Sequence, residues 1–476
     1  MTHYLMKRLI TALLFVCVCA FAEAPSTFAI RNARIVTVGG PVIAKGTVVV
    51  RKGLIEAAGE NVAIPQDAWV VDGEGLTVYP GLIDPLSTVG MPGAAPAAVT
   101  TTAGRGGGRG QTTPTAPAAP ALITATVAVV APPARGPEDR PATTSWVIAA
   151  DEMQPTDRRI ETVRSAGFTT AVTFPTRGIF GGQGSIVDLL SGEKAGGMVL
   201  VPSVGQYISL TRGGGGGGGG MGGGFPSSLM GAISYIRQIY LDAEHYKLVQ
   251  DTYAKDPRGM ERPAYDRALE GVLASRRILL PANRLVEMDR MLRFAGELKQ
   301  PVILYGVRES YRPEAVEILK RGAVPVLVSL RWSEAPRDAN PDDVDSLRTL
   351  ETRDKAASAP ALLKKAGVQF ALYSDGLDQP RDLQRAVKKA IDAGLSREDA
   401  VRALTLSVAE IYGVADRIGS IEKGKIANLV VTRGDIFDDR TTVEMIFVDG
   451  RKFTPAAETA MPGGRGPVTD DPGGVR

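Results

Sequence analysis

Apolar and polar positions follow one rhythm at the two ends of this chain and another in its middle. Near both ends, short β-branched runs alternate with turn residues, which is typical of strands; they cover residues 33–38, 46–50, 427–431 and 445–448. Gly53 completes a tight turn, and Asp449-Gly450 predicts a hairpin, because both central residues of such a turn need positive φ. The two ends therefore predict a small β-sandwich domain assembled from residues 28–78 and 418–455.

The middle of the chain alternates apolar strands with amphipathic helices. The strand candidates are residues 78–84, 169–174, 198–201, 278–281, 302–305, 324–330 and 370–373. Between strands, apolar residues recur at helical spacing, as at Leu285, Met288 and Leu292. Such alternation predicts an α/β fold with a parallel sheet, and the length favours a (β/α)8 barrel over residues 79–417. The pattern does not locate the eighth strand.

One further helix is predicted near the end of the barrel. Ser396 followed by Asp399 is typical of a capping box, in which a side-chain oxygen accepts a backbone N–H of the first turn. Apolar residues from Val401 to Ile411 then lie on one helical face, and Gly413 ends the element.

Three segments interrupt these patterns. Residues 91–120 are rich in Ala, Gly, Thr and Pro, residues 211–225 include eight consecutive glycines, and the tail 456–476 is rich in Pro and Gly. Such segments bury too little surface to offset their ordering entropy, so we expect flexible inserts and a flexible tail. The Arg-Gly run at 104–110 also allows nucleic-acid contact, but a solvated loop is the expected role.

The N-terminus is typical of a secretory signal peptide. Lys7 and Arg8 precede an apolar run over residues 9–22, and Ala20-Phe21-Ala22 offers a small-x-small cleavage site. The alternative is a retained anchor, but a spanning helix needs about 20 apolar residues. We therefore expect a signal peptide at residues 1–22 and a secreted or periplasmic protein that has no membrane attachment after cleavage.

Composition narrows the chemistry that is available to the exported chain. The formal net charge is +3, and removal of the two basic signal residues leaves 53 Lys and Arg against 52 Asp and Glu. This near balance argues against a nucleic-acid partner. Cys17, Cys19 and His3 lie in the signal peptide, so the mature chain has no thiol and one histidine, His245. The content of 44% hydrophobic residues is sufficient for a large core.

Three motifs together resemble the amidohydrolase superfamily, particularly a secreted branch similar to imidazolonepropionase. They are residues 71–84, residues 166–172 followed by Gly181-Gly182-Gln183-Gly184, and residues 416–430. The resemblance assigns them to the start of the barrel, to its second strand and following loop, and to the return into the β domain. It covers most of residues 28–455.

The resemblance implies metal-assisted hydrolysis of carbon–nitrogen bonds, with zinc or another divalent metal held by histidines and an aspartate. In this chain the histidine positions fall on Leu86 and Thr88, on Pro281, and near Tyr305 or Gly306. Only the aspartate of the last strand is kept, as Asp375. A lone histidine cannot build a four-ligand zinc site, so we expect no metal cofactor.

A few residues remain as site candidates. Asp375 is the candidate catalytic proton shuttle, and it has two structural alternatives, a capping role or pairing with an arginine in the barrel mouth. Asn283, Tyr305 and Ser374 are candidate substrate-binding residues. Asp375 with Asp378 also allows an oxygen-only site for a hard cation.

Two further polar residues are expected to serve the structure. Asp84 is expected to accept hydrogen bonds from backbone near its strand end, and His245 to lie on a helix surface. Other catalytic routes lack their residues, because the chain has no Gly-x-Ser-x-Gly motif and Gly181–Gly184 lacks a phosphate-loop lysine.

The sequence thus favours an exported, catalytically impaired pseudoenzyme with an amidohydrolase fold. Its expected partner is a small molecule or peptide bound in the barrel mouth; an active relative that keeps its histidines and a second copy of the chain are the alternatives. The competing hypotheses are a working hydrolase of non-peptide carbon–nitrogen bonds that uses Asp375, and a scaffolding module of the cell envelope.

Overall fold

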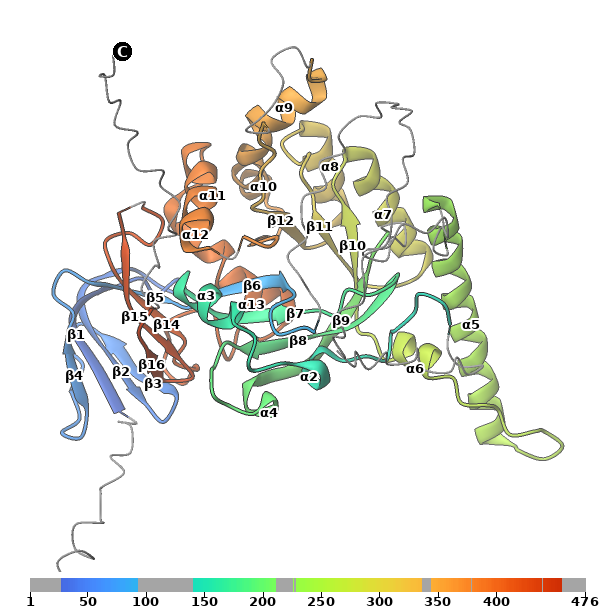
Figure 1. The fold of residues 1–476 in the computed structure, drawn as a ribbon, viewed down its shortest axis with the longest axis horizontal. Helices are drawn as coiled ribbons and strands as arrows, with labels where there is room; N and C mark the ends of the chain where they lie inside the picture. Colours follow the sequence, from blue (N-terminus) through green and yellow to red (C-terminus); the bar gives the residue numbers. More distant parts are fainter. Residues whose placement is uncertain are drawn as a thin grey trace, which may run out of the picture.

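The fold is organised by two eight-stranded sheets (Figure 1). The computed structural model describes residues 27–92, 140–210, 226, 228–335, 344–377, 379–438 and 440–455. The predicted signal peptide, nearly all of the insert 91–120, the insert 211–225 and the tail 456–476 lie outside these ranges. Within them, no helix is both long and apolar enough to cross a lipid bilayer.

The first sheet combines both ends of the chain. Its strands are β1 (Thr27–Ile35), β2 (Ile43–Arg51), β3 (Leu54–Gly59), β4 (Trp69–Asp72), β5 (Thr77–Pro80), β14 (Leu429–Arg433), β15 (Thr442–Val448) and β16 (Arg451–Phe453). The order is β16-β15-β14-β5-β1-β2-β3, with β4 beside β1. Phe28 from one end packs edge-to-face on Phe447 from the other, with ring centroids 5.3 Å apart. The two ends therefore share one core.

The predicted hairpin turns are confirmed. Asp449 and Gly450 join β15 to β16 with φ of 49° and 70°, and Lys52 and Gly53 join β2 to β3 with φ of 49° and 81°. Glycine at the second position suits this backbone because it has no Cβ to clash.

The second sheet forms the barrel. Its strands are β6 (Leu82–Ser87), β7 (Phe168–Thr173), β8 (Phe180–Asp188), β9 (Val199–Ile208), β10 (Ile278–Ala282), β11 (Val302–Gly306), β12 (Val326–Ser329) and β13 (Phe370–Tyr373). Neighbours pair in chain order from β6 to β13, so the predicted α/β barrel fold is confirmed. One strand departs from a regular (β/α)8 pattern, because β8 is antiparallel to both β7 and β9.

β8 is the eighth strand that the sequence pattern did not locate. It contains Gly181–Gly184, which the family resemblance assigned to a loop, so that assignment is wrong. The glycines permit close packing instead of a loop: a Cβ at Gly184 would lie 2.1 Å from the ring of Phe174. Absence of a side chain thus allows a strand to approach its neighbour closely.

The predicted strand over residues 78–84 is two strands that belong to different sheets. β5 ends at Pro80 and β6 begins at Leu82. Gly81 between them has its N–H bonded to the carbonyl of Asn428 at 2.8 Å. A Cβ at Gly81 would lie 2.0 Å from the Thr169 hydroxyl. The chain therefore passes from the β domain into the barrel at a glycine that packs directly on the barrel wall.

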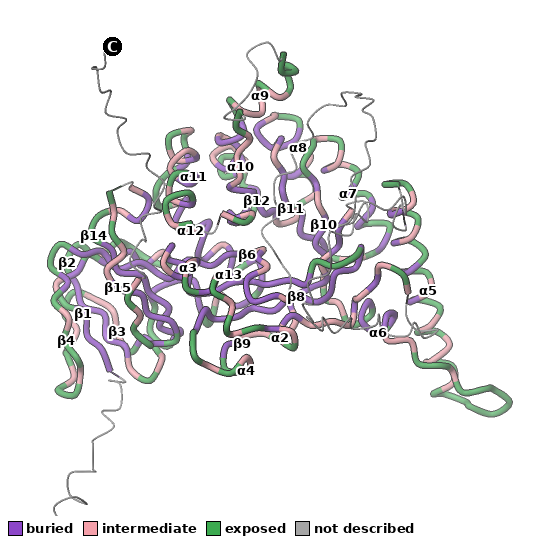
Figure 2. The backbone as a smooth tube through the Cα atoms, viewed as in Figure 1, coloured by how far each residue is buried: buried purple, intermediate pink, exposed green. Residues whose placement is uncertain are grey.

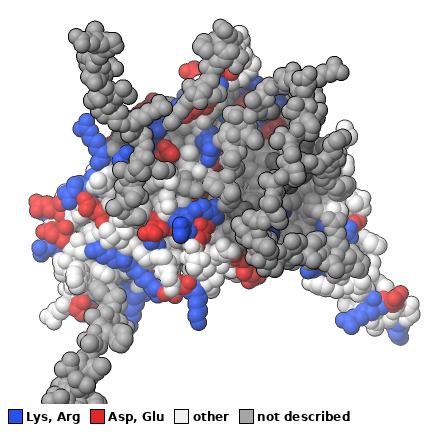
Figure 3. Space-filling model, in the orientation of Figure 1, with Lys and Arg blue, Asp and Glu red and all other residues white. Residues whose placement is uncertain are grey.

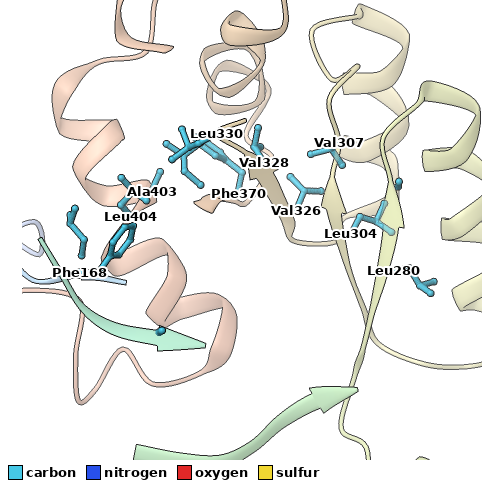
Figure 4. Close-up of a cluster of buried hydrophobic side chains, with 14 of the residues drawn as sticks. Phe168, Leu280, Leu304, Val307, Val326, Val328, Leu330, Phe370, Ala403 and Leu404 are labelled. Atoms are coloured by element: carbon cyan, nitrogen blue, oxygen red, sulfur yellow. The ribbon is translucent and has the colours of Figure 1, made fainter. Parts of the chain in front are cut away.

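Helices cover the outside of the barrel. They are α2 (Ala149–Glu152), α3 (Arg159–Ser165), α4 (Ala195–Met198), α5 (Leu229–Lys255), α6 (Arg267–Leu273), α7 (Leu285–Glu297), α8 (Pro313–Gly322), α9 (Leu347–Lys355), η1 (Ala356–Ser358), α10 (Ala359–Ala366), α11 (Pro380–Asp392), α12 (Arg397–Ala403) and α13 (Leu406–Tyr412). Apolar side chains of β10 to β13 lie between the sheet and this layer, among them Leu280, Leu304, Val328 and Phe370 (Figure 4). Figure 2 shows buried barrel strands, whereas much of α5 and α9 is exposed.

The helix that was predicted from Ser396 to Gly413 is two helices. Ser396 caps α12 by accepting the N–H of Asp399 at 3.0 Å, as its sequence predicts. The helix then breaks at Thr405, which has non-helical backbone angles. The carbonyl of Leu404 accepts the N–H of Ile83 at 2.7 Å. Because that carbonyl bonds to the barrel strand β6, docking on the barrel interrupts the helix.

Candidate functional site

The carboxyl ends of neighbouring barrel strands bring a set of polar side chains together. In barrels of this kind, functional residues gather at this end of the strands. Asp375 follows β13, and its Oδ2 accepts hydrogen bonds from Nη2 of Arg308 at 3.0 Å and from Oγ of Ser329 at 2.6 Å. Nε of Arg331 donates to the Asp375 carbonyl at 2.8 Å. Asp375 therefore joins the ends of β11, β12 and β13.

The charges of this cluster do not cancel. The guanidinium groups of Arg308 and Arg331 both bond to Asp375, one through its carboxylate and the other through its backbone. Among these three residues, two positive groups stand against one negative group. The side chains of Arg308 and Asp375 are 38% and 31% exposed, so solvent screening limits the ion pair to about 1 kcal/mol of stability.

Tyrosine side chains lie beside the charged cluster. Tyr305 of β11 stacks on Tyr207 of β9, with ring centroids 5.5 Å apart, and its hydroxyl donates to the Tyr207 hydroxyl at 3.0 Å. Burial raises the pKa of Tyr207, Tyr305 and Tyr373, and the nearby Asp375 carboxylate raises all three further. These phenols are therefore protonated near neutral pH and serve as hydrogen-bonding groups on an aromatic wall.

Ser374, a predicted substrate-binding residue, is bonded within the barrel wall. Its N–H donates to Oδ1 of Asp84 at 3.2 Å and its hydroxyl to Oδ2 at 2.6 Å, and both residues are buried. Asp84 belongs to β6 and Ser374 follows β13, which are the two ends of the barrel sheet. The expected bonding of Asp84 to backbone near a strand end is thus observed, and the contact helps to close the barrel.

Asn283 lies at the rim. It follows β10, is exposed, and its side chain covers Gly306, where a Cβ would lie 2.3 Å from the Asn283 Oδ1. The structure therefore gathers Asp375, Tyr305 and Asn283 along the same end of the barrel, whereas the Ser374 hydroxyl bonds to Asp84. Asp378 lies outside the described residues.

The residues at the family's metal positions do not fit a metal. Leu86 packs against the same apolar cluster inside the barrel as Tyr207 and Tyr305. The Thr88 hydroxyl accepts a hydrogen bond from Arg159 at 3.3 Å. Across the part of the chain that the structure describes, no group of three or more His, Cys, Asp and Glu residues is placed to hold a metal ion. His245 is exposed on α5.

Sequence reasoning left pairing of Asp375 with an arginine of the barrel mouth as an alternative, which the bond to Arg308 matches, but it identified none of Arg308, Ser329 and Arg331. Each stands at or within two residues of the end of a strand, since β11 ends at Gly306 and β12 at Ser329. Polar residues at these positions point to a site in a barrel, so the signal was present once the strands were recognised. Where described residues are visible in Figure 3, acidic and basic side chains are interspersed.

Comparisons with known proteins agree with this architecture. Residues 309–456 match the amidohydrolase family. A solved amidohydrolase from Thermotoga maritima superposes with a TM-score of 0.67 at 24% identity, over 90% of this chain and 100% of that one. Molinate hydrolase superposes with a TM-score of 0.51 at 15% identity, over 90% and 95%. At these identities the likeness concerns the fold.

A curated relative matches a short stretch. Adenine deaminase from Moorella thermoacetica is 35% identical over 69 residues, which is 14% of this chain and 11% of that protein. The chain thus matches about a tenth of the length of this relative.

Proposed function

We propose that this amidohydrolase-fold protein is an exported, metal-depleted binding protein that holds a small molecule or peptide in its barrel mouth. The observation that carries the proposal is the bond between Arg308 and Asp375. In the family, the aspartate of the last strand serves a metal. Here the positive group beside the aspartate is a guanidinium. An arginine keeps this charge at any physiological pH.

The positions on the first barrel strand where the family has metal-binding histidines support the same proposal. A ligand site for zinc needs imidazole, thiolate or carboxylate groups, whereas Leu86 adds an apolar side chain to the inside of the barrel. Loss of these groups removes the means of activating water, and catalysis by a bound metal depends on that activation.

The side chains at the barrel mouth are suited to binding a ligand. Small-molecule sites combine an apolar or aromatic wall with a few convergent polar groups. The stacked Tyr207 and Tyr305 supply the wall, and Arg308, Arg331 and Asp375 supply the polar groups. An active relative that keeps its histidines, or a second copy of this chain, is the alternative partner.

A hydrolase of non-peptide carbon–nitrogen bonds is the second candidate function. It is favoured by the position of Asp375, which is half-exposed at the end of the last barrel strand. In that function the carboxylate accepts a proton from water, and replacing it abolishes turnover.

Thermal unfolding of the mature, untagged chain separates these functions, because a ligand of the folded state raises the melting temperature. We expect no shift with zinc and none with a chelator, but a saturable shift with at least one small molecule or peptide. Zinc-dependent hydrolysis of a carbon–nitrogen bond that disappears in Asp375→Ala would support the hydrolase and contradict the proposal.

A further inference from the structure

We infer that the barrel mouth recognises a carboxylate, held by Arg308 and Arg331. This inference rests on the proposed function, since it names the chemical class of the ligand bound there. It implies an inversion of charge: where the family's fold holds a cation, this chain presents cations and binds an anion.

The two arginines converge from different strands. Arg308 follows β11 and Arg331 follows β12, and both donate to the same residue, Asp375. The N–H of Arg331 also donates to Oγ of Ser329 at 3.1 Å, and that hydroxyl donates to the Asp375 carboxylate. The cluster therefore fixes the positions of both guanidinium groups.

The backbone of the turn positions Arg331. Asp375 and Gly376 have positive φ of 50° and 80°, which places the Asp375 carbonyl against the Arg331 side chain. A Cβ at Gly376 would lie 3.1 Å from Nη2 of Arg331. Arg331 bonds the carbonyl of Asp375 and forms no ion pair with its carboxylate.

The guanidinium groups keep donors for a ligand. A guanidinium has five N–H groups. Among the described residues, Nη2 of Arg308 donates to Asp375 and Nε is buried, whereas Nη1 donates to no described residue. Its side chain is 38% exposed, so the exposed edge of the group is open to an acceptor.

The chemistry of these donors selects a carboxylate. A planar guanidinium binds a planar carboxylate through two parallel hydrogen bonds, which a neutral amide cannot reproduce. The neighbouring Tyr207 and Tyr305 rings offer an aromatic face to the body of the ligand. The group recognised is therefore a carboxylate next to an apolar or aromatic body, from either a free acid or the C-terminus of a peptide.

Matched acid and amide pairs test this inference by calorimetry on the mature protein. The probes are phenylacetate against phenylacetamide, butanoate against butanamide, and the tripeptide Ala-Ala-Phe with a free or an amidated C-terminus. We expect each recognised acid to bind at least about tenfold more tightly than its amide. A charge-assisted hydrogen bond contributes enough free energy for that difference in Kd. Preference for the tripeptide acid over both small acids identifies a peptide terminus as the source.

Variants locate the binding to the two arginines. Arg308→Gln and Arg331→Gln should each weaken acid binding about tenfold, and Arg308→Lys should recover part of it by restoring the charge without the fork. Arg433→Gln is the matched control, because Arg433 pairs with Glu444 on the β domain. Retention of the thermal unfolding midpoint in each variant shows that the loss concerns binding.

Equal binding of acids and amides, acid affinity that survives both Gln substitutions, or no binding of any acid in the panel would each overturn the inference. Binding of the neutral amides in the absence of metal would still leave the proposed function intact. A stoichiometric metal would overturn the proposed function itself.

Discussion

Two aspartates at opposite ends of the barrel show how differently one fold treats a carboxylate. Asp188 ends β8 at the side that faces the β domain, and it is 2% exposed. Its Oδ1 accepts hydrogen bonds from the Thr170 hydroxyl at 2.9 Å and the Asn428 amide at 2.8 Å. Asp375 at the mouth is instead half-exposed and bonded to two arginines.

One of these carboxylates serves the internal structure, and the other lies on a surface that meets solvent. Asn428 also accepts the N–H of Asp449 at 2.7 Å, so Asp188 belongs to the junction between barrel and β domain. Its partners are neutral, and burial raises the pKa of Asp188 to about 7. The arginines around Asp375 provide a charge that a buried neutral network does not.

The largest expected effect follows from Asp188. Its folded-state pKa is about 7 against an ordinary value of 3.8, so the folded state binds the proton more tightly than the unfolded state does. The stabilisation is full below about pH 4 and is lost as pH rises to about 7, by on the order of 4 kcal/mol. Asp188→Asn keeps an oxygen acceptor and removes the titration, so it should be more stable than the wild type at pH 8.

Urea unfolding of both proteins at several pH values between 4 and 8 checks this prediction. Asp354→Asn, an exposed position on α9, is the matched control. If the difference in unfolding free energy between Asp188→Asn and the wild type were the same at every pH, Asp188 would not be the titrating group.

The second effect concerns the closure of the barrel. Asp84→Ala leaves the N–H and hydroxyl of the buried Ser374 without their acceptor. We expect the unfolding free energy to fall by about 3 kcal/mol, because hydrogen bonds to a charged group contribute more stability than bonds between neutral groups. Ser374→Ala removes one bond and should cost clearly less in the same denaturation experiment; equal costs for the two variants would contradict the pairing.

A smaller effect is expected in the tyrosine wall. Tyr305→Phe keeps the ring stack with Tyr207 and removes the bond between the hydroxyls. The expected loss of stability is about 1 kcal/mol, measured by urea unfolding beside Tyr265→Phe, a position that is 69% exposed. A Tyr305→Phe protein as stable as that control would show that the hydroxyl bond contributes nothing.

The smallest effect is expected at His245, the single histidine outside the predicted signal peptide. His245 is exposed on α5, and substitutions at such positions usually change stability by less than about 0.5 kcal/mol. His245→Ala should therefore unfold like the wild type and bind ligands with unchanged affinity. A clear loss of ligand affinity in this variant would place the site elsewhere.

How far the sequence predicts this molecule depends on how local each feature is. The hairpin at Asp449-Gly450 was predictable because two adjacent residues determine it. Strand β8 was missed because its glycines are typical of a loop, and only the Phe174 ring packed against Gly184 explains them. The bond between Arg308 and Asp375 joins residues 67 positions apart, so it depends on the barrel and no local pattern contains it.

The metal content of the chain without its predicted signal peptide decides whether Asp375 serves a metal. The untagged chain would be purified without chelator from zinc-supplemented culture, and metal measured per mole of chain by mass spectrometry. We expect far less than one equivalent, because the Arg308 guanidinium donates to the carboxylate of Asp375 that a metal would otherwise engage. A near-stoichiometric metal that is lost in Asp375→Ala would contradict it.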